Sequence, residues 1–244
     1  MTDRRCYRNG RGDTMKTIGL IGGMSWESTV TYYQVINETI KKQLGGLHSA
    51  KCILYSVDFD EIEKYQASGE WDKSADVLSE AAQALERAGA DYIVICTNTM
   101  HKVAPEIGRR IHIPILHIAD MTAVQLKKHG IRKVGLLGTK YTMQQDFYKN
   151  ILIEQGIEVV IPNDAGVDIV NHIIYDELCL GKILEESKAV YLDIIHELAR
   201  NGAQGIILGC TEIGLLIQQS DTDIPLFDTT LIHAKQAALK SLER

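Results

Sequence analysis

Short apolar runs alternate with longer amphipathic stretches along most of this chain. The runs are rich in Ile, Val and Leu and have the length of buried strands, whereas segments such as 74–88 and 185–200 repeat apolar residues at helical spacing. Strands that alternate with helices predict parallel sheets covered on both faces, and therefore an α/β fold. The predicted strands are 17–21, 52–57, 92–96, 115–118, 133–137, 158–161, 205–208 and 226–227.

The sequence also contains an internal repeat. ADYIVICT matches AQGIILGC, IGLIG matches VGLLG, and IPI matches IPL, in the same order and at nearly the same offset. This repeat predicts two pseudo-symmetric lobes, each a mainly parallel sheet flanked by helices, with the active site in the cleft between them. Because an Ile-Pro segment follows the main repeat of each lobe, we expect the chain to change lobes there. Residues 15–112 and 226–244 would then form the first lobe, and 113–225 the second.

Composition restricts the class of protein. The chain has 244 residues and a formal net charge of −6, which argues against a nucleic-acid partner. No apolar stretch reaches the roughly 18 residues of a membrane span. The five cysteines are widely spaced, which favours reduced thiols and a cytoplasmic location. Residues 1–14 are polar and basic, so we expect a disordered extension there rather than a secretory signal.

Two residues at equivalent positions of the repeat are candidates for chemistry. Cys210 follows a predicted strand and precedes a predicted helix, whose N-terminal partial charge would stabilise a thiolate. Its counterpart in the first lobe is Thr97. Ligands of open α/β sheets bind beyond the carboxyl ends of the strands, so both residues should face the cleft from opposite sides. Successive strand residues point to opposite faces, so Cys96 should point into the core.

Polar groups near the same strand ends suit a small ligand with a carboxylate. Asn98, Thr99 and Thr211 offer amide, hydroxyl and backbone N–H donors at two helix starts, where they could bind a carboxylate or only cap the helices. Glu212 would orient an amino group of the ligand or complete a cap. The glycine-containing turns lack the full dinucleotide-binding spacing, and the scattered histidines and cysteines lack metal-ligand spacing. We therefore expect no cofactor and no metal.

Three motifs together resemble the aspartate/glutamate racemase superfamily. They are GLIGGMSW, CTNTMH and GCTE, and the resemblance covers nearly all of residues 15–242. It implies a cofactor-independent amino-acid racemase, an isomerase in which one residue removes the substrate α-proton and another protonates the opposite face. By motif, the proton-transferring pair would be Thr97 and Cys210. The residues in contact with the substrate would be Met24, Gln66, Asn98, Thr99, Thr211 and Glu212.

The sequence departs from the family pattern at the first of the two catalytic positions, where Thr97 stands in place of a cysteine. It therefore resembles most the branch with a threonine/cysteine pair, which is specific for L-aspartate and L-glutamate. A threonine hydroxyl is far less acidic than a thiol, so Thr97 should donate a proton but be a poor base. In related racemases the second-lobe cysteine acts on the L-enantiomer, so we expect L-to-D turnover to dominate. The resemblance also implies a homodimer.

Two other functions remain open. Arylmalonate decarboxylases of the same superfamily keep only the second-lobe cysteine, which here is Cys210. A protein without its first base could also bind amino acids without converting them. Lys182 could pair with a substrate carboxylate, and His101 could act as an acid or base, although a lone histidine on a short helix is usually structural. All these alternatives involve a small-molecule ligand, without a nucleic-acid or membrane partner.

Overall fold

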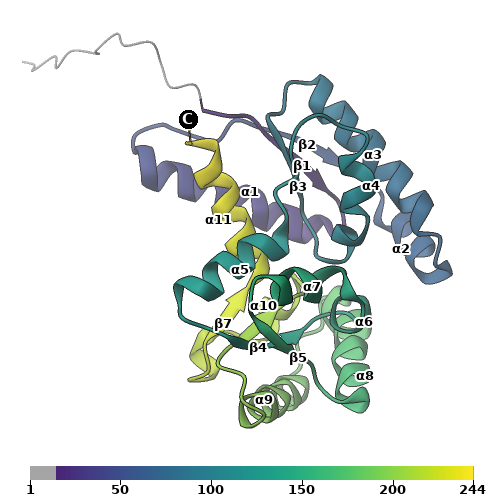
Figure 1. Ribbon diagram of the computed structural model, residues 1–244, viewed down its shortest axis with the longest axis vertical. Helices are drawn as coiled ribbons and strands as arrows, with labels where there is room; N and C mark the ends of the chain where they lie inside the picture. The colour runs from purple at the N-terminus through teal and green to yellow at the C-terminus, as the bar shows by residue number, and fades with distance from the viewer. Residues whose placement is uncertain (1–14, 244) are drawn as a thin grey trace, which may run out of the picture.

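The computed structural model describes residues 15–243; the predicted extension 1–14 lies outside them. Two separate sheets, each flanked by helices, confirm the predicted α/β architecture (Figure 1). The first sheet has the strand order β2-β1-β3 and the second β5-β4-β6-β7, and all strand pairs in these sheets are parallel. The strands are β1 (Ile18–Gly22), β2 (Cys52–Ser56), β3 (Tyr92–Ile95), β4 (Lys133–Leu137), β5 (Glu158–Val160), β6 (Ile206–Leu208) and β7 (Leu226–Asp228).

The first lobe has a hydrophobic core on each face of its sheet. Side chains alternate along β1, so that Ile21 packs into one core and Leu20 into the other. The segment after the last short helix of this lobe adds one isolated parallel bridge, between Ile93 and Ile115. The helices of this part of the chain are α1 (Trp26–Leu44), α2 (Phe59–Ser68), α3 (Trp71–Arg87), the 3-10 helix η1 (Thr99–Val103) and α4 (Ala104–Gly108).

The second lobe is built around a single large core. Side-chain oxygens of Thr139, Asn163 and Asp228 accept hydrogen bonds from backbone N–H groups at the starts of three helices, which explains where those helices begin. The helices in the rest of the chain are α5 (Ile118–Lys128), α6 (Lys140–Gln144), α7 (Asp146–Glu154), α8 (Asp164–His172), the π-helix η2 (Ile173–Glu177), the 3-10 helix η3 (Leu178–Leu180), α9 (Glu185–Arg200), α10 (Ile213–Leu216), the 3-10 helix η4 (Gln219–Asp221) and α11 (Thr229–Ser241).

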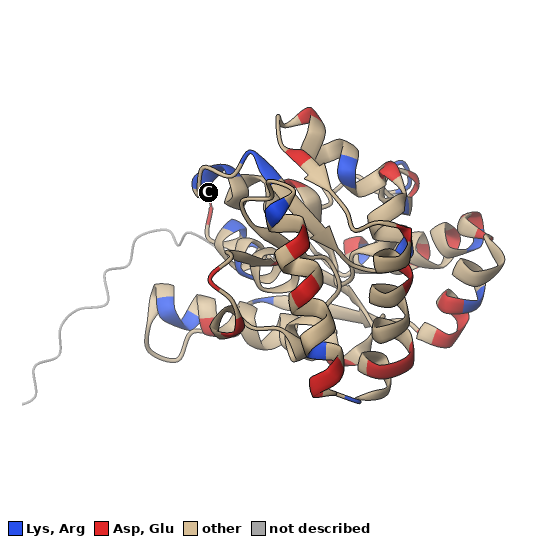
Figure 2. Ribbon diagram, turned by 90° about the horizontal axis from the view of Figure 1, so that it is seen from below, with Lys and Arg blue, Asp and Glu red and all other residues tan. Residues whose placement is uncertain are grey.

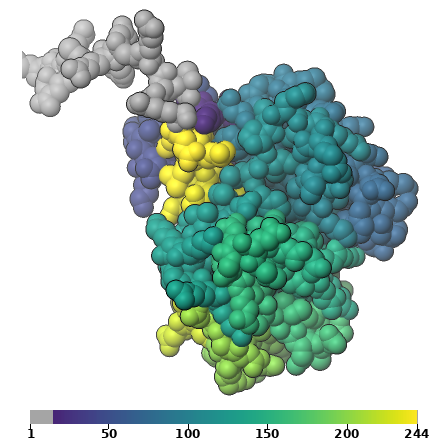
Figure 3. Space-filling model, in the orientation of Figure 1, coloured from purple at the N-terminus to yellow at the C-terminus, as the bar shows by residue number. Residues whose placement is uncertain are grey.

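The lobes exchange helices rather than strands. The helix α5 packs in the core of the second lobe, whereas α11 places Ala234, Ala237 and Ala238 against the first sheet. In Figure 1 the yellow α11 runs from the second sheet to lie beside α1, and the space-filling view in Figure 3 shows its atoms next to the first lobe. These small alanine side chains allow the helix backbone to approach the sheet closely.

The lobe boundaries predicted from the sequence were therefore wrong by one element at each crossing. The segment 226–228 is β7 and pairs with β6, so it lies in the second lobe. The predicted strand 115–118 makes only the bridge at Ile115, and α5 already begins at Ile118. In both cases the backbone of the extended segment forms its hydrogen bonds with a strand of the lobe that precedes it. The chain passes to the other lobe only after this segment.

Charged residues are distributed over both lobes. In the view of Figure 2, acidic and basic residues occur on many helices, and the basic ones form no continuous face. Within residues 15–243, none of the helices has the length and hydropathy needed to cross a bilayer.

Candidate active site

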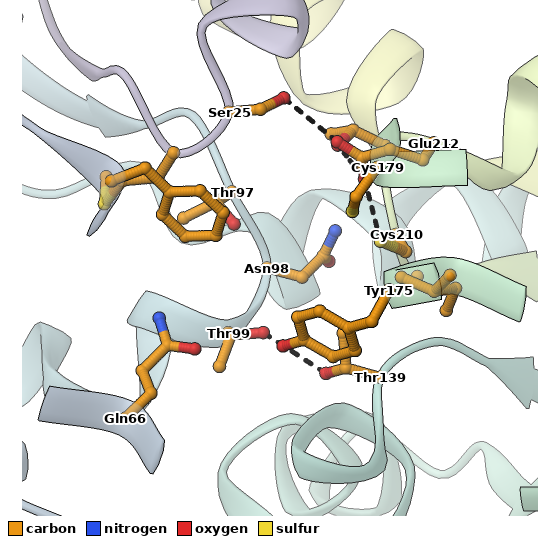
Figure 4. Close-up of a pocket in the computed structure, with 15 residues that line it drawn as sticks. Ser25, Gln66, Thr97, Asn98, Thr99, Thr139, Tyr175, Cys179, Cys210 and Glu212 are labelled. Atoms are coloured by element: carbon orange, nitrogen blue, oxygen red, sulfur yellow. Dashed lines mark hydrogen bonds between the residues drawn. The ribbon is translucent and has the colours of Figure 1, made fainter. Parts of the chain in front are cut away.

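The residues predicted from the motifs meet in one pocket between the lobes (Figure 4). The pocket has a volume of about 40 Å³, which is room for roughly three water molecules. Thr97 reaches it from the end of β3 in the first lobe, and Cys210 from the end of β6 in the second. All of the predicted site residues line this pocket: Met24, Gln66, Thr97, Asn98, Thr99, Cys210, Thr211 and Glu212.

The Glu212 carboxylate is the centre of the hydrogen bonds on the second-lobe side. The Cys210 thiol donates to Glu212 Oε2 at 2.9 Å, and the Thr211 hydroxyl donates to the same oxygen at 2.6 Å. Ser25, from the first lobe, donates to Glu212 Oε1 at 3.0 Å. Hydrogen bonds to a carboxylate are strengthened by its charge, so these contacts fix Glu212 beside the thiol. Glu212 is therefore positioned to accept the Cys210 proton.

The Cys210 thiol is protonated in this arrangement. Burial raises the pKa of Cys210 well above its ordinary value, and the negative charge of Glu212 raises it further. The expectation that a helix start lowers this pKa was wrong. The following helix, α10, has only four residues and begins three residues later, at Ile213. Its weak partial charge does not offset desolvation and an adjacent carboxylate.

The alternation of side chains along β3 separates Thr97 from Cys96. Cys96 is fully buried and packs with Tyr92 and Val94 in the core that α11 covers, as predicted. Burial raises the pKa of the Cys96 thiol far above its usual range, so Cys96 remains a neutral core residue. Thr97 is partly exposed and lines the pocket.

His101 supports the backbone of Thr97 and does not line the pocket. Its Nδ1–H donates to the Thr97 carbonyl at 2.8 Å, and its Nε2 accepts from the Ile118 N–H at 3.2 Å. Burial, with the neighbouring His117 and His233, lowers the pKa of His101 well below its ordinary value. His101 is therefore a neutral structural residue that joins the end of β3 to the start of α5.

Two polar contacts hold the first-lobe donors against the second lobe. Asn98 Nδ2 donates to the Thr229 hydroxyl at 3.0 Å, and the Thr229 hydroxyl itself donates to the Leu208 carbonyl at 2.9 Å. The hydroxyl of Thr99 lies 3.3 Å from that of Thr139. Because Thr229 uses its hydrogen on Leu208, it can only accept from Asn98, which fixes the orientation of the Asn98 amide.

The fixed orientation of Asn98 leaves one polar atom of the pocket wall unsatisfied. Asn98 Oδ1 is buried and has no hydrogen-bond partner among the described residues. A buried acceptor without a donor is costly. A ligand with an N–H group would supply the missing donor, and Figure 4 shows the Asn98 side chain extending toward the middle of the pocket.

Several lining residues were not predicted from the sequence. Thr139 caps α6, and the glycine-containing turn before it was the only signal of its position. Ile174, Tyr175 and Cys179 come from the π-helix η2 and from η3, for which the sequence shows no periodic pattern. Lys182 is exposed and does not line the pocket. The other lining residues that the sequence analysis missed are Ser25, Phe59 and Gly209.

The glycine-rich turn that carries Met24 into the pocket is required by packing. Gly23 has φ of +92°, and a Cβ at this position would lie 2.2 Å from the Val57 carbonyl oxygen. Its N–H donates to the Thr29 hydroxyl at 2.9 Å. Gly23 therefore brings the turn against the neighbouring strand end and leaves the contact with a ligand to Met24 and Ser25. Within residues 15–243, no three His, Cys, Asp or Glu side chains are grouped so that they could hold a metal ion.

The fold and the pocket define a class of protein: a two-lobed α/β enzyme that places a thiol and a hydroxyl from different lobes around one small site. Residues 21–237 match the Asp/Glu/hydantoin racemase family. The chain belongs to this family, which confirms the resemblance found in its motifs and the expectation of a racemase-type isomerase.

Similar proteins agree with this assignment. An Asp/Glu racemase candidate from Yersinia pestis is 58% identical, with a TM-score of 0.89 over 94% of this chain and 100% of that one. An aspartate racemase homologue from Pyrococcus horikoshii is 39% identical, with a TM-score of 0.82 over the same shares of the two chains. The broad specificity amino-acid racemase RacX of Bacillus subtilis is 26% identical over 231 residues, which are 89% of this chain and 95% of RacX.

The contact between Cys210 and Glu212 predicts how the thiol titrates. In wild-type protein, alkylation of Cys210 by iodoacetamide should become fast only above the ordinary thiol pKa of 9.0. Glu212→Gln removes the repelling charge, so the rise in alkylation rate should move to lower pH. Site-resolved mass spectrometry of Cys210 measures this profile, with the fully buried Cys96 as the unreactive internal reference. If the midpoint pH of Cys210 alkylation in Glu212→Gln is the same as in wild type or higher, Glu212 does not raise the pKa of Cys210.

Proposed function

We propose that the protein is a cofactor-independent amino-acid racemase that acts on L-aspartate or L-glutamate through Cys210 and Thr97. The observation that carries the proposal is the single pocket lined by a thiol from one lobe and a hydroxyl from the other. In Figure 4, Thr97 and Cys210 stand on different sides of this pocket. An α-carbon between them would be open to proton removal on one face and protonation on the other.

The first step starts from the L-enantiomer. Glu212 accepts the Cys210 proton along the 2.9 Å hydrogen bond, and the thiolate then takes the α-proton of the substrate. The bond between Cα and hydrogen breaks, its electron pair passes into the enolate of the α-carboxylate, and Cys210 is again a thiol. The raised pKa of Cys210 makes its thiolate a strong base.

The second step delivers a proton from Thr97. The hydroxyl protonates Cα on the opposite face, which gives the D-enantiomer and an alkoxide. Water that reaches the partly exposed Thr97 restores its proton, and Glu212 returns its proton to solvent. The reverse reaction needs Thr97 as a base. Because an alkanol reaches its anion far less readily than a thiol, kcat from the L-enantiomer should exceed kcat from the D-enantiomer. The two values of kcat/KM stay equal, because the enantiomers have the same free energy.

Uncharged hydrogen-bond donors of the pocket, and one acceptor that has no partner among the described residues, would hold the substrate. The hydroxyls of Thr99 and Thr139 lie together on the pocket wall and suit a carboxylate. Asn98 Oδ1 suits the ammonium group, because that atom is buried without a donor. For aspartate or glutamate, the amide of Gln66, which is buried and lines the same pocket, offers a donor to the side-chain carboxylate.

Because Cys210 is the proposed base and Thr97 the proposed proton donor, substitutions at these two residues should have different effects. Cys210→Ser should lower the racemisation rate at least about 100-fold, because serine keeps the shape but not the accessible anion. Thr97→Cys should raise turnover of the D-isomer more than turnover of the L-isomer. Initial rates from each pure enantiomer of aspartate and glutamate, followed by chiral chromatography, measure both effects.

Cys96→Ala is the matched control for these variants. It should leave kcat unchanged and lower the free energy of unfolding by on the order of 1 kcal/mol, since it empties a small volume of the core. Loss of activity in Cys96→Ala with an unaffected Thr97→Ala would show that Cys96 is the first-lobe base.

Decarboxylation of phenylmalonate by a protein that leaves aspartate and glutamate unchanged would favour the decarboxylase alternative.

The orientation of Asn98 predicts a separate effect on binding. Thr229→Val removes the hydroxyl that orders the amide, so the ammonium group loses its fixed acceptor. KM for the amino acid should rise about tenfold, the scale of one hydrogen bond to a charged group. Inhibition by glutarate, which lacks the amino group, should change little, and Thr229→Ser should behave like wild type. Equal losses for the amino acid and for glutarate would refute this role of Asn98.

A further inference from the structure

A second cavity adjoins the catalytic pocket. It has a volume of about 260 Å³, compared with about 40 Å³ for the catalytic pocket. The two share lining residues from both lobes, so they lie next to each other. The shared residues are Ser25, Phe59, Cys179, Thr211 and Glu212. We call the second cavity the outer recess.

The outer recess has apolar walls and a negative charge. Trp26, Phe59, Leu178 and Leu215 line it, and Trp26 and Leu215 are largely exposed. No lysine, arginine or histidine lines the recess, whereas the carboxylates of Glu27 and Glu212 both do. Apolar walls with a few placed polar groups are typical of small-molecule sites.

The carboxylate of Glu27 is available to a ligand. Glu27 lies in the first turn of α1 and is exposed at the mouth of the outer recess. Within residues 15–243, no lysine or arginine forms an ion pair with it. Glu212, in contrast, already holds three hydroxyl or thiol donors. Burial raises the pKa of Cys179, which lines the recess, to about 12, and the negative charges of Glu212 and Glu27 contribute to this rise.

We propose that the outer recess is a side-chain subsite for amino acids with a long side chain that ends in a cation, and that Glu27 selects them. This inference rests on the proposed racemase function. The methylene stem of such a side chain would pack on Phe59 and Leu178, and its cationic end would reach Glu27 beside the exposed face of Trp26. A side-chain carboxylate in the same recess would meet two acids and no basic residue.

The experiment compares L-lysine with L-glutamate in the full-length protein. Exchange of the α-proton in D₂O is followed by NMR for wild type, Glu27→Gln, Glu27→Lys and the control Glu38→Gln. Glu38 lies on the same helix outside the recess, so its variant makes the same charge change away from the proposed subsite. The quantity measured is the ratio of kcat/KM for L-lysine to kcat/KM for L-glutamate.

We expect Glu27→Gln to lower this ratio about threefold, the scale of an exposed ion pair, and Glu27→Lys to lower it about tenfold or more. The effect should shrink at high salt, and Glu38→Gln should match wild type. Exchange of L-glutamate without exchange of L-lysine overturns the subsite and leaves the racemase function intact. Exchange of L-lysine that is insensitive to both Glu27 variants also overturns it. If none of the amino acids exchanges, the racemase function fails, and the subsite fails with it.

Discussion

The helix α11 determines how the two lobes face each other. It starts at the second sheet, where the Thr229 hydroxyl binds the Leu208 carbonyl, and its alanine face ends in the core of the first lobe. His233 on this helix donates to the Leu116 carbonyl and accepts from the Tyr32 hydroxyl, each at 2.8 Å, so the crossing is fixed by buried hydrogen bonds as well as by packing. The relative positions of Thr97 and Cys210 depend on this connection, because each belongs to a different sheet.

The chemical asymmetry of the site follows from one carboxylate. Glu212 keeps the Cys210 thiol protonated in the resting protein and is also the nearest acceptor for its proton. Thr97 has no corresponding acidic neighbour among the residues that line the pocket, where Glu212 is the one carboxylate. In the proposed mechanism, a base on one side and a proton donor on the other make kcat from the L-enantiomer higher than kcat from the D-enantiomer.

The sequence predicted the parts of this site that depend on local periodicity. The repeat aligned Thr97 with Cys210, and strand alternation placed Cys96 in the core. The helix exchange could not be predicted, because the Ile-Pro segments suit a strand in either lobe and the choice depends on pairing with β3 or β6. Tyr175 and Cys179 were missed because they come from irregular helical turns. The raised pKa of Cys210 was missed because it arises from burial and from the side-chain orientation of Glu212, which a sequence does not show.

The central claim is that Cys210 alone handles the α-proton of the L-enantiomer. The most direct measurement is deuterium incorporation at Cα of L-glutamate and L-aspartate in D₂O by Thr97→Ala protein, with Cys210→Ser as the comparison. The account predicts that Thr97→Ala still exchanges the α-proton of the L-isomer while forming little D-isomer, and that Cys210→Ser exchanges neither. Exchange of the L-isomer that survives in Cys210→Ser but disappears in Thr97→Ala would contradict it.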